Sequence, residues 1–236
     1  MLCWRTSKSR NTAMQLSFIT MHPASSTALA PSAVKGLRYI PNFLSQEQHL
    51  RLLNTIDTEY SGRWLDDLAR RVQHYGFRYE YKSRKADSST YLGPLPPFLV
   101  DLGMCLVREG YMPSMPNQAI VNEYLPGQGI SAHIDCIPCF GPVIASISLG
   151  SSCVMDFLHK VDKHQAQIML EPRSLLVFSE DSRYLWTHEI VGRRNDKVDG
   201  LTRPRERRVS ITFRTVITDR KAVSGRSESR KGTQKA

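Results

Sequence analysis

The sequence predicts an α+β fold, mainly β, in which a double-stranded β-helix (jelly roll) carries N-terminal helices packed on its outside. Two segments with helical spacing lie in the first half of the chain. The part downstream consists of short runs rich in β-branched or aromatic residues, separated by Gly, Pro, Asn or Ser. At 236 residues, the chain is long enough for one domain with tails.

The two predicted helices have clear boundaries. Ser45 with Gln48 three residues later is the pattern of a capping box. The positions expected to face the core of this helix are Leu50, Leu53, Ile56 and Tyr60. A second helix is predicted from Pro96-Pro97 to Gly110, because proline favours the first turn and glycine a helix end. Its apolar face consists of Phe98, Leu102 and Leu106.

At least six strands are predicted after the second helix. They are Ala119–Tyr124, Val143–Leu149, Cys153–Phe157, Gln167–Leu170, Ser174–Phe178 and Val209–Ile217. The last one alternates most clearly, with apolar residues at 209, 211 and 213 and polar residues at 210, 212 and 214. Side chains two apart on a strand share a face, so this strand is expected to have one apolar and one polar face.

The two ends of the chain differ in composition from the middle. We divide the chain into a disordered or targeting extension at 1–36, one domain at 37–217 and a basic disordered tail at 218–236. The formal net charge of +10 is concentrated at these ends, and no acidic residue precedes Glu47. Basic tails attract polyanions without sequence preference, or they are simply solvated.

Composition also bears on the compartment. No apolar run approaches the length of a membrane span, so no membrane contact is expected. The five cysteines are odd in number and irregularly spaced, which favours a reducing compartment over a secreted disulfide framework. We expect a cytoplasmic or nuclear protein, and the acid-free N-terminal segment is also compatible with import into an organelle.

The residues that carry chemistry begin with His133-Ile134-Asp135, followed much later by His188. On an extended segment His133 and Asp135 project from one face, so both could bind one ion. Two imidazoles and one carboxylate form the ligand set of non-haem Fe(II) centres with open coordination positions. The alternative is that these histidines are partly exposed polar residues at the rim of the sheets.

Two arginines follow the third predicted ligand on the last predicted strand. Arg208 and Arg214 have the same parity, so they share a face. If that face is buried, the guanidinium groups need an anionic partner. A dicarboxylate co-substrate would supply one through a bidentate pair.

Several motifs in order resemble the AlkB-like Fe(II)/2-oxoglutarate dioxygenases. They are Asn122-Glu123-Tyr124-Leu125-Pro126-Gly127 with His133-Ile134-Asp135, then Ile147-Ser148-Leu149-Gly150, Pro172-Arg173-Ser174-Leu175, Ser182-Arg183-Tyr184-Leu185-Trp186-Thr187-His188 and Arg208 to Arg214. The resemblance spans about residues 37–217. Within that family, residues 70–76 and the segment before His188 look most like the branch that acts on tRNA wobble uridine, whose RNA-recognition and methyltransferase domains have no counterpart in this sequence.

The resemblance implies a role for each matching residue. His133, Asp135 and His188 would bind Fe(II). Asn122, Tyr124 and Arg208 would hold 2-oxoglutarate, with Arg208 on its distal carboxylate, and Arg214 would lie near the iron-side carboxylate or Asp135. Such an enzyme uses O2 to convert 2-oxoglutarate to succinate and CO2 while it hydroxylates a C–H bond, and an N-methyl group treated in this way is lost as formaldehyde.

Residues 70–85 interleave basic and aromatic side chains, a composition typical of single-stranded nucleic-acid contacts. In the family, this stretch corresponds to a nucleotide-recognition lid. The predicted substrate-binding residues are Arg70, Arg71, Gln73, His74, Tyr75, Arg78 and Tyr81. The alternative is an edge hairpin whose tyrosines at period two are core residues.

We therefore expect a dioxygenase that hydroxylates or demethylates a nucleobase, with RNA slightly favoured over alkylated DNA. The alternatives are the same chemistry on a protein side chain, or a catalytically inactive nucleic-acid-binding module. A monomer is expected, and an accessory protein could replace the missing domains. Cys136 and Cys139 form an isolated C-x-x-C, which favours an ordinary loop over a zinc site or a redox pair.

Overall fold

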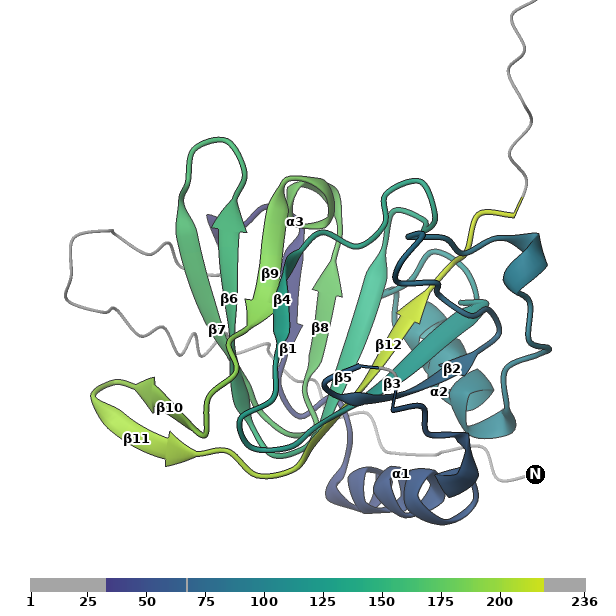
Figure 1. The fold of residues 1–236 in the computed structure, drawn as a ribbon, viewed down its shortest axis with the longest axis horizontal. Helices are drawn as coiled ribbons and strands as arrows, with labels where there is room; N and C mark the ends of the chain where they lie inside the picture. Colours follow the sequence, from purple (N-terminus) through teal and green to yellow (C-terminus); the bar gives the residue numbers. More distant parts are fainter. Residues whose placement is uncertain (1–32, 67, 219–236) are drawn as a thin grey trace, which may run out of the picture.

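Two antiparallel sheets face each other, and two helices cover the outer side of the larger one (Figure 1). The computed structural model describes residues 33–66 and 68–218. The larger sheet has the order β1 (Leu37–Ile40), β8 (Leu175–Phe178), β5 (Ile144–Gly150), β12 (Arg208–Arg214), β3 (Gln118–Tyr124) and β2 (Arg71–Tyr75). The smaller sheet has the order β4 (Ile130–His133), β9 (Trp186–Ile190), β6 (Cys153–His159) and β7 (Gln165–Leu170). The predicted jelly roll is confirmed.

The remaining elements connect or cover these sheets. They are α1 (Gln46–Thr58), α2 (Pro97–Arg108), α3 (Glu180–Tyr184), the short 3-10 turns η2 (Ser61–Arg63) and η3 (Ser88–Thr90), and a hairpin of β10 (Asn195–Val198) and β11 (Leu201–Pro204). Within the described residues, no helix has the length and apolar character needed to cross a membrane. The predicted N-terminal extension and basic tail lie almost wholly outside the described residues, so both remain predictions.

Helix α1 begins at the predicted capping box. The Ser45 hydroxyl accepts a hydrogen bond from the Gln48 backbone at 3.1 Å, and the Gln48 side chain accepts one from the Ser45 backbone at 2.7 Å. The predicted apolar face is partly wrong, because Leu50 is 56% exposed and Leu52 is buried instead. His49 is also buried on that face, where its Nε2 accepts a hydrogen bond from the Gly150 backbone.

Helix α2 packs largely as the sequence predicts. Its first residue is Pro97, and the predicted Leu102 and Leu106 are buried against the larger sheet, whereas Phe98 is only partly buried and Leu99, which was not predicted, is fully buried. The helix ends before Gly110, which has a φ of +71°, a conformation that glycine adopts without steric cost. Both helices therefore bury their apolar faces on the outer side of the larger sheet.

Strand β12 lies in the middle of the larger sheet, between β3 and β5. Val209, Ile211 and Phe213 have no exposed surface and pack toward the helices. Arg208 and Arg214 are on the opposite face and are buried too, so the face predicted to be polar lies inside the protein. The strand ends at Arg214, three residues before the predicted end.

A second apolar cluster fills the space between the two sheets. It includes Ile144, Leu176 and Phe178 from the larger sheet and Phe157 and Trp186 from the smaller one. The polar face of β12 also lies in the interior, where Arg208 contacts the ring of Tyr124 and Arg214 that of Phe140.

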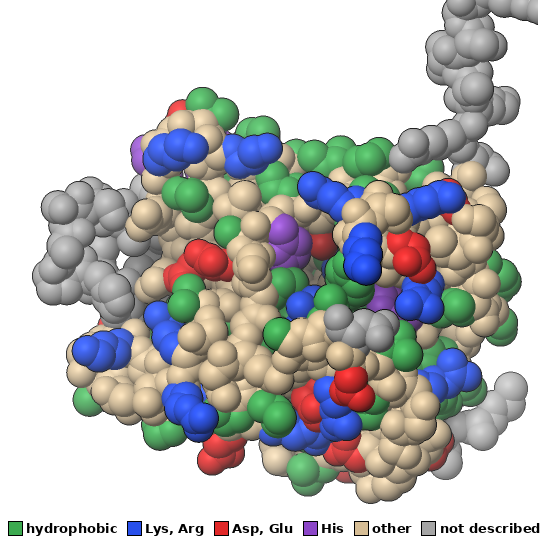
Figure 2. Space-filling view, in the orientation of Figure 1, with side chains coloured by type: hydrophobic (Ala, Val, Ile, Leu, Met, Phe, Trp, Pro, Cys, Tyr) green, Lys and Arg blue, Asp and Glu red, His purple; other side chains and the backbone are tan. Residues whose placement is uncertain are grey.

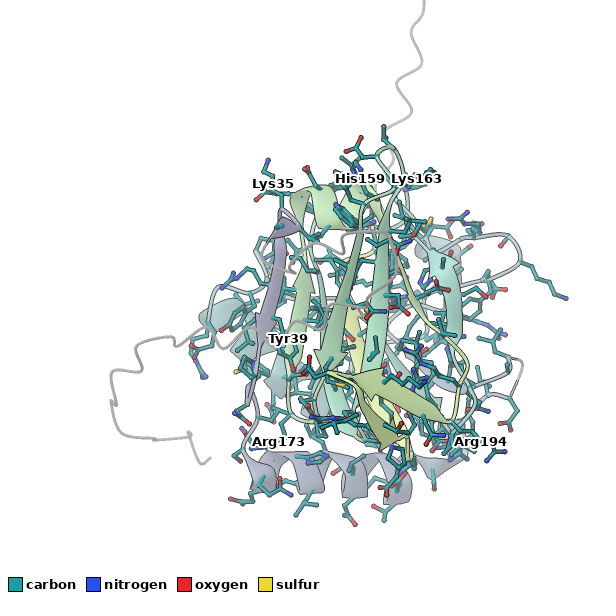
Figure 3. All side chains as sticks on the ribbon, turned by 90° about the vertical axis from the view of Figure 1, so that its left-hand side faces the viewer. Lys35, Tyr39, His159, Lys163, Arg173 and Arg194 are labelled. Atoms are coloured by element: carbon teal, nitrogen blue, oxygen red, sulfur yellow. A yellow bond between two sulfur atoms is a disulfide. The ribbon has the colours of Figure 1, made fainter. Side chains whose placement is uncertain are left out.

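The sequence does not reveal β1 or the β10–β11 hairpin. Strand β1 is an edge strand paired with β8, and the Tyr39 hydroxyl accepts a hydrogen bond from the Glu171 backbone at 3.1 Å (Figure 3). The hairpin is held by buried Asp196, which accepts hydrogen bonds from Arg193 and Arg205 and from the Val154 backbone. Figure 3 shows His159 and Lys163 at one end of the sheets and Arg194 at the other.

Candidate metal centre

The two predicted histidine ligands face each other across a strand pair. His133, the last residue of β4, is the register partner of His188 in β9, and their ring centroids are 4.4 Å apart. Gly129 permits the close approach of the chain just before β4, since a Cβ there would lie 2.0 Å from the Ile190 carbonyl oxygen. The sheet itself therefore brings together two residues that are far apart in sequence.

Asp135 completes a three-residue cluster with these histidines. One ligand atom from each of the three residues lies within 4.8 Å of the others, and His133 Nε2 is 3.7 Å from Asp135 Oδ1. Within the described part of the chain, no other group of His, Cys, Asp or Glu is arranged in this way. Two imidazoles and one carboxylate on one side of an ion match the ligand set for non-haem Fe(II).

The backbone orients the ring of His133. Its Nδ1 lies 2.7 Å from the Ser131 carbonyl oxygen. This contact is a hydrogen bond only if Nδ1 carries the proton, which leaves the Nε2 lone pair free for a metal. Outer contacts of this kind commonly fix the tautomer of a metal-binding histidine.

Asp135 is ionised in the folded protein. Burial by itself raises the pKa of its carboxyl group, but Arg214, His188 and His133 outweigh this effect and hold the pKa well below its usual range. Arg214 donates hydrogen bonds to both carboxylate oxygens, each at 3.2 Å. The ligand is therefore charged and held in one orientation before any metal binds.

His188 is neutral in the metal-free protein at physiological pH. Burial, followed by the neighbouring His133, lowers its pKa to about 3. A neutral imidazole is the form that binds a metal, so protons do not compete for this residue near neutrality.

The shift at His188 predicts a pH dependence of stability in the metal-free protein. Between pH 6.5 and about 3 the unfolded chain takes up a proton on this residue that the folded protein does not. The free energy of unfolding should therefore fall as the pH decreases through this window. Urea unfolding in the presence of a chelator, at pH 7.5 and 5, measures the effect.

The variant His188→Gln provides the comparison for this pH prediction. His49 also has a lowered pKa because of burial, so it adds a change of the same sign in both proteins. The wild-type protein should lose more stability between pH 7.5 and 5 than His188→Gln. Equal losses would show that His188 does not cause the dependence.

Arg208 lies in an environment that suits a carboxylate ligand. It is 3% exposed, and its Nη2 donates a hydrogen bond to the Ser148 hydroxyl at 2.8 Å. Its Nε and Nη1 are buried and have no hydrogen-bond partner. Buried N–H groups of a cation without an acceptor are costly, and the carboxylate of a dicarboxylic acid would satisfy them.

Asn122 and Tyr124 lie beside Arg208 on the neighbouring strand. Tyr124 is the register partner of Arg208, whose guanidinium carbon is 5.4 Å from the centre of the tyrosine ring. The side-chain Oδ1 of Asn122 accepts a hydrogen bond from Arg70 Nε at 3.1 Å. The residues expected to hold 2-oxoglutarate thus form one group between the sheets, and Ser148 is a member that the sequence did not single out.

The triad, together with Arg208 and Arg214, is suited to an oxidation that uses a keto acid. A bound Fe(II) ion with 2-oxoglutarate and O2 supplies an oxidant strong enough to hydroxylate a C–H bond. The protein's own residues would bind and orient these groups: the triad could supply the metal ligands, Arg214 keeps Asp135 ionised, and Arg208 offers N–H donors to an acid. The apolar cluster between the sheets excludes water from one side.

The predicted substrate residues divide between the two faces of β2. Arg71 forms a bidentate ion pair with Glu123, and Tyr75 packs among the helix-side core residues. The Tyr75 hydroxyl donates to the Gln73 side chain, which in turn donates to the Tyr60 carbonyl. Gln73 and Tyr75 are thus engaged in the core, on the face of β2 opposite Asn122, and their positions do not support a role in substrate contact.

The other predicted substrate residues lie just before β2, on its inner face or in the segment after it. His74 packs edge-on against Tyr81, and the guanidinium carbon of Arg70 is 5.9 Å from the Tyr81 ring centre. Arg78 is exposed and pairs with Glu80. Arg70 and Arg71 also line a cavity of about 450 Å³, whose lining includes none of the triad.

One face of the molecule is hollowed (Figure 2). Figure 2 shows a histidine and an acidic side chain in this hollow, with Lys and Arg side chains on either side of it. The exposed basic residues of the segment after β2 are Arg78, Lys82, Arg84 and Lys85. A hollow with basic surroundings favours an anionic substrate.

The loop after Asp135 differs from expectation. Cys136 and Cys139 are joined by a disulfide bond, whereas the sequence favours an ordinary loop. Cys153 is buried between the sheets as a free thiol, so the structure does not support a zinc site that combines it with this pair.

Comparison with known families agrees with this geometry. Residues 36–214 match the 2OG-Fe(II) oxygenase superfamily. The chain belongs to this superfamily. It is an AlkB-like member and a dioxygenase enzyme, and the family implies Fe(II) and 2-oxoglutarate as its cofactor and co-substrate.

Known relatives of this oxygenase differ in length. An uncharacterized protein of Acanthamoeba polyphaga mimivirus is 34% identical over 188 residues, which cover 79% of this chain and 88% of that protein. The tRNA (carboxymethyluridine(34)-5-O)-methyltransferase ALKBH8 of Mus musculus is 40% identical over 168 residues, which cover 69% of this chain and 25% of that protein. The alkylated DNA repair protein ALKBH8 homolog of Arabidopsis thaliana is 34% identical over 209 residues, covering 78% of this chain and 59% of its own length.

A solved structure shows the same fold. The structure of OsALKBH1 has a TM-score of 0.58 and 18% sequence identity, and the match covers 80% of this chain and 99% of that chain. At this identity the likeness concerns the fold alone. The oxygenase spans about a quarter of the length of the mouse relative, so the activity of that whole protein does not transfer to it.

Proposed function

We propose that this AlkB-like oxygenase hydroxylates or demethylates a nucleobase in single-stranded or locally unpaired nucleic acid, with RNA ahead of DNA. In this proposal His133, Asp135 and His188 bind Fe(II). Arg208, together with Asn122 and Tyr124, holds 2-oxoglutarate. The products are succinate, CO2 and the modified base.

The choice of a nucleobase as the substrate rests on the position of Tyr81. The ring centre of Tyr81, from the segment after β2, lies 5.9 Å from the guanidinium carbon of Arg70, and the positive charge of Arg214 also acts on its hydroxyl group. Arg214 is the partner of Asp135, so the aromatic ring of Tyr81 lies near the metal ligands. Burial raises the pKa of Tyr81, which therefore stays neutral.

Aromatic neighbours extend this surface. Tyr79 contacts Tyr81 edge to face, with ring centres 5.1 Å apart, and His74 contacts it at 5.8 Å. A base stacked on an aromatic ring gains about 1–3 kcal/mol, and nearby arginines attract the phosphates. Because a base inside a duplex could not reach the triad, the nucleotide must be unpaired or flipped.

The names of the relatives support nucleic acid as the substrate class. The mouse protein is named for tRNA and the Arabidopsis protein for alkylated DNA, and both share this domain. A protein side chain is the competing substrate, and a binding assay distinguishes the two. Single-stranded RNA should bind to the wild-type enzyme, and neutralising Arg70, Arg71 and Arg78 together should abolish binding.

The direct test is mass spectrometry of nucleosides from RNA and DNA treated with the purified enzyme, Fe(II) and 2-oxoglutarate. A nucleoside whose mass changes with succinate release would identify the target. Unchanged nucleosides in both tRNA and DNA, together with oxidised peptides in a protein lysate, would reject the nucleobase proposal.

Tyr81→Ala tests the stacking surface. We expect the KM for the nucleic-acid substrate to rise about tenfold, since a stacking contact is worth about 1–3 kcal/mol. The KM for 2-oxoglutarate should change much less. Lys197→Ala, on the exposed β10–β11 hairpin, is the matched control and should leave both values unchanged. An unchanged nucleic-acid KM in Tyr81→Ala would remove Tyr81 from the binding surface.

A further inference from the structure

Arg183, near the end of α3, is a buried cation whose hydrogen bonds all end on main-chain carbonyls. It is 2% exposed, and its four hydrogen bonds go to carbonyl oxygens. Its guanidinium carbon also lies 5.1 Å from the ring centre of Tyr184, the next residue in the chain. Burial lowers the pKa of Arg183. Because a buried charge is costly, its position here calls for a structural reason.

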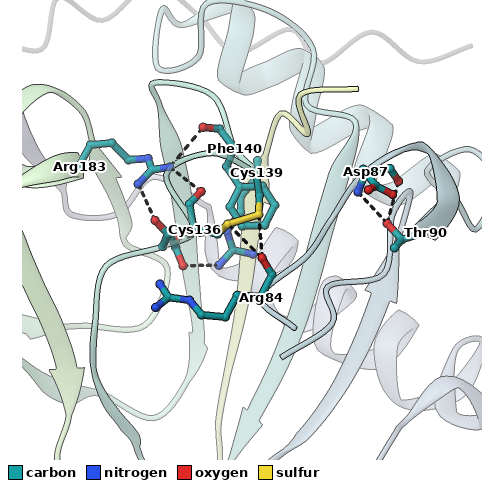
Figure 4. The surroundings of a disulfide bond; sticks show 9 residues. Arg84, Asp87, Thr90, Cys136, Cys139, Phe140 and Arg183 are labelled. Carbon is teal, nitrogen blue, oxygen red and sulfur yellow. Dashed lines mark hydrogen bonds and ion pairs between the residues drawn. A yellow bond between two sulfur atoms is a disulfide. The ribbon is translucent and has the colours of Figure 1, made fainter. Parts of the chain in front are cut away.

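The four carbonyls belong to the loop that begins at the metal ligand Asp135. Arg183 Nη1 donates to the Asp135 carbonyl at 2.9 Å, and Nη2 donates to those of Cys136 and Phe140, each at 3.3 Å. Nε donates to the Gly141 carbonyl at 3.3 Å. The loop therefore wraps around one guanidinium group (Figure 4).

Asp135 is consequently held through both its main chain and its side chain. Arg183 binds its main-chain carbonyl, and Arg214 binds its carboxylate. Arg183 also lies on the helix that leads directly into β9, the strand of His188. It thus links the two chain segments that carry Asp135 and His188.

We propose that Arg183 is a positioning residue for the metal centre, which fixes the Asp135 loop relative to His188 so that both can bind one ion. The proposal rests on the assignment of the metal ligands under the proposed function. Arginine suits this role because its planar group carries five N–H donors in a fixed fork. Lysine has three donors on one nitrogen and could not reach the same four carbonyls in the same geometry.

The test measures metal affinity separately from activity. Metal-free wild-type protein, Arg183→Lys and Arg183→Met are titrated with Mn²⁺, and binding is followed by electron paramagnetic resonance. Loss of an outer contact to a metal ligand typically costs about 10–100-fold in affinity. We expect a Mn²⁺ Kd raised by about that factor in Arg183→Met and by less in Arg183→Lys.

A core variant distinguishes positioning from general destabilisation. Leu99→Ala, in the helix-side core away from the triad, should lower the Tm but keep the wild-type Mn²⁺ affinity. The proposal is overturned if either Arg183 variant folds and binds Mn²⁺ like the wild type. It is also overturned if neither folds while Leu99→Ala does, because Arg183 would then be a general core residue.

The metal assignment has its own control. If the wild-type protein itself binds no Mn²⁺, or if Asp135→Asn binds it equally well, the assigned triad is wrong. Tight binding by the wild type and loss in Asp135→Asn confirm the triad, and the Arg183 variants then report on positioning alone.

Discussion

Replacing Arg208 with methionine is expected to raise the 2-oxoglutarate concentration for half-maximal succinate formation by about 100-fold or more. Removing one partner of a buried ion pair costs about 3–5 kcal/mol, which corresponds to roughly 10²–10⁴ in affinity. Methionine keeps much of the apolar stem but has no N–H donor. Succinate formation measured against 2-oxoglutarate concentration gives the value.

The same substitution should not destabilise the ligand-free enzyme. Two nitrogens of Arg208 are buried without a partner, so its removal also removes an unsatisfied cation. The Tm without 2-oxoglutarate should therefore stay level or rise, and the increase on adding 2-oxoglutarate should disappear. Arg203→Met, an exposed arginine that pairs with Glu171, is the control and should behave like the wild type. A wild-type KM in Arg208→Met would contradict the assignment.

Asp135→Asn is expected to reduce succinate formation by more than about 100-fold. Loss of an outer contact at a metal site already costs about 10–100-fold, and this change removes a metal ligand itself. It should also lower the stability of the metal-free protein, because Arg214 would lose its buried anionic partner. Activity and urea unfolding are measured on the same preparation.

A double variant separates the two effects of Asp135→Asn. Adding Arg214→Gln removes the unpaired cation, so stability should recover in part while activity remains lost. Asp101→Asn, on the exposed side of α2, is a control for the loss of a carboxylate and should change neither quantity. Full activity in Asp135→Asn would exclude this residue as a ligand.

Much of the fold was predictable where local signals and burial agree. The capping box at Ser45, the proline start of α2 and the β-branched runs all correspond to observed elements. Strand β9 was not predicted, because the segment Thr187-His188-Glu189 is polar and lacks apolar alternation. Its pairing with β4 and β6 is a tertiary effect that overrides local propensity.

The triad and the two arginines were recognisable because their spacing and residue types are restricted by chemistry. The strand register that places His133 opposite His188 could not be recognised from the sequence, because strand pairing depends on the whole sheet. Residues 70–81 were harder to interpret. Gly76 has a φ of +75° and a Cβ there would lie 1.8 Å from the Asn117 carbonyl oxygen, so the strand is interrupted. Period-two parity therefore does not continue from Tyr75 to Tyr81.

The central place of β12 in the larger sheet has a consequence for biosynthesis. It is the last described strand in the chain, yet it separates β5 from β3, which are both made earlier. During translation the sheet therefore remains in two parts until residue 214 has left the ribosome. The same event delivers Arg208 and Arg214, so these two buried arginines enter the interior only when the sheet closes. Folding of this domain should be slow, as expected for contacts between distant segments.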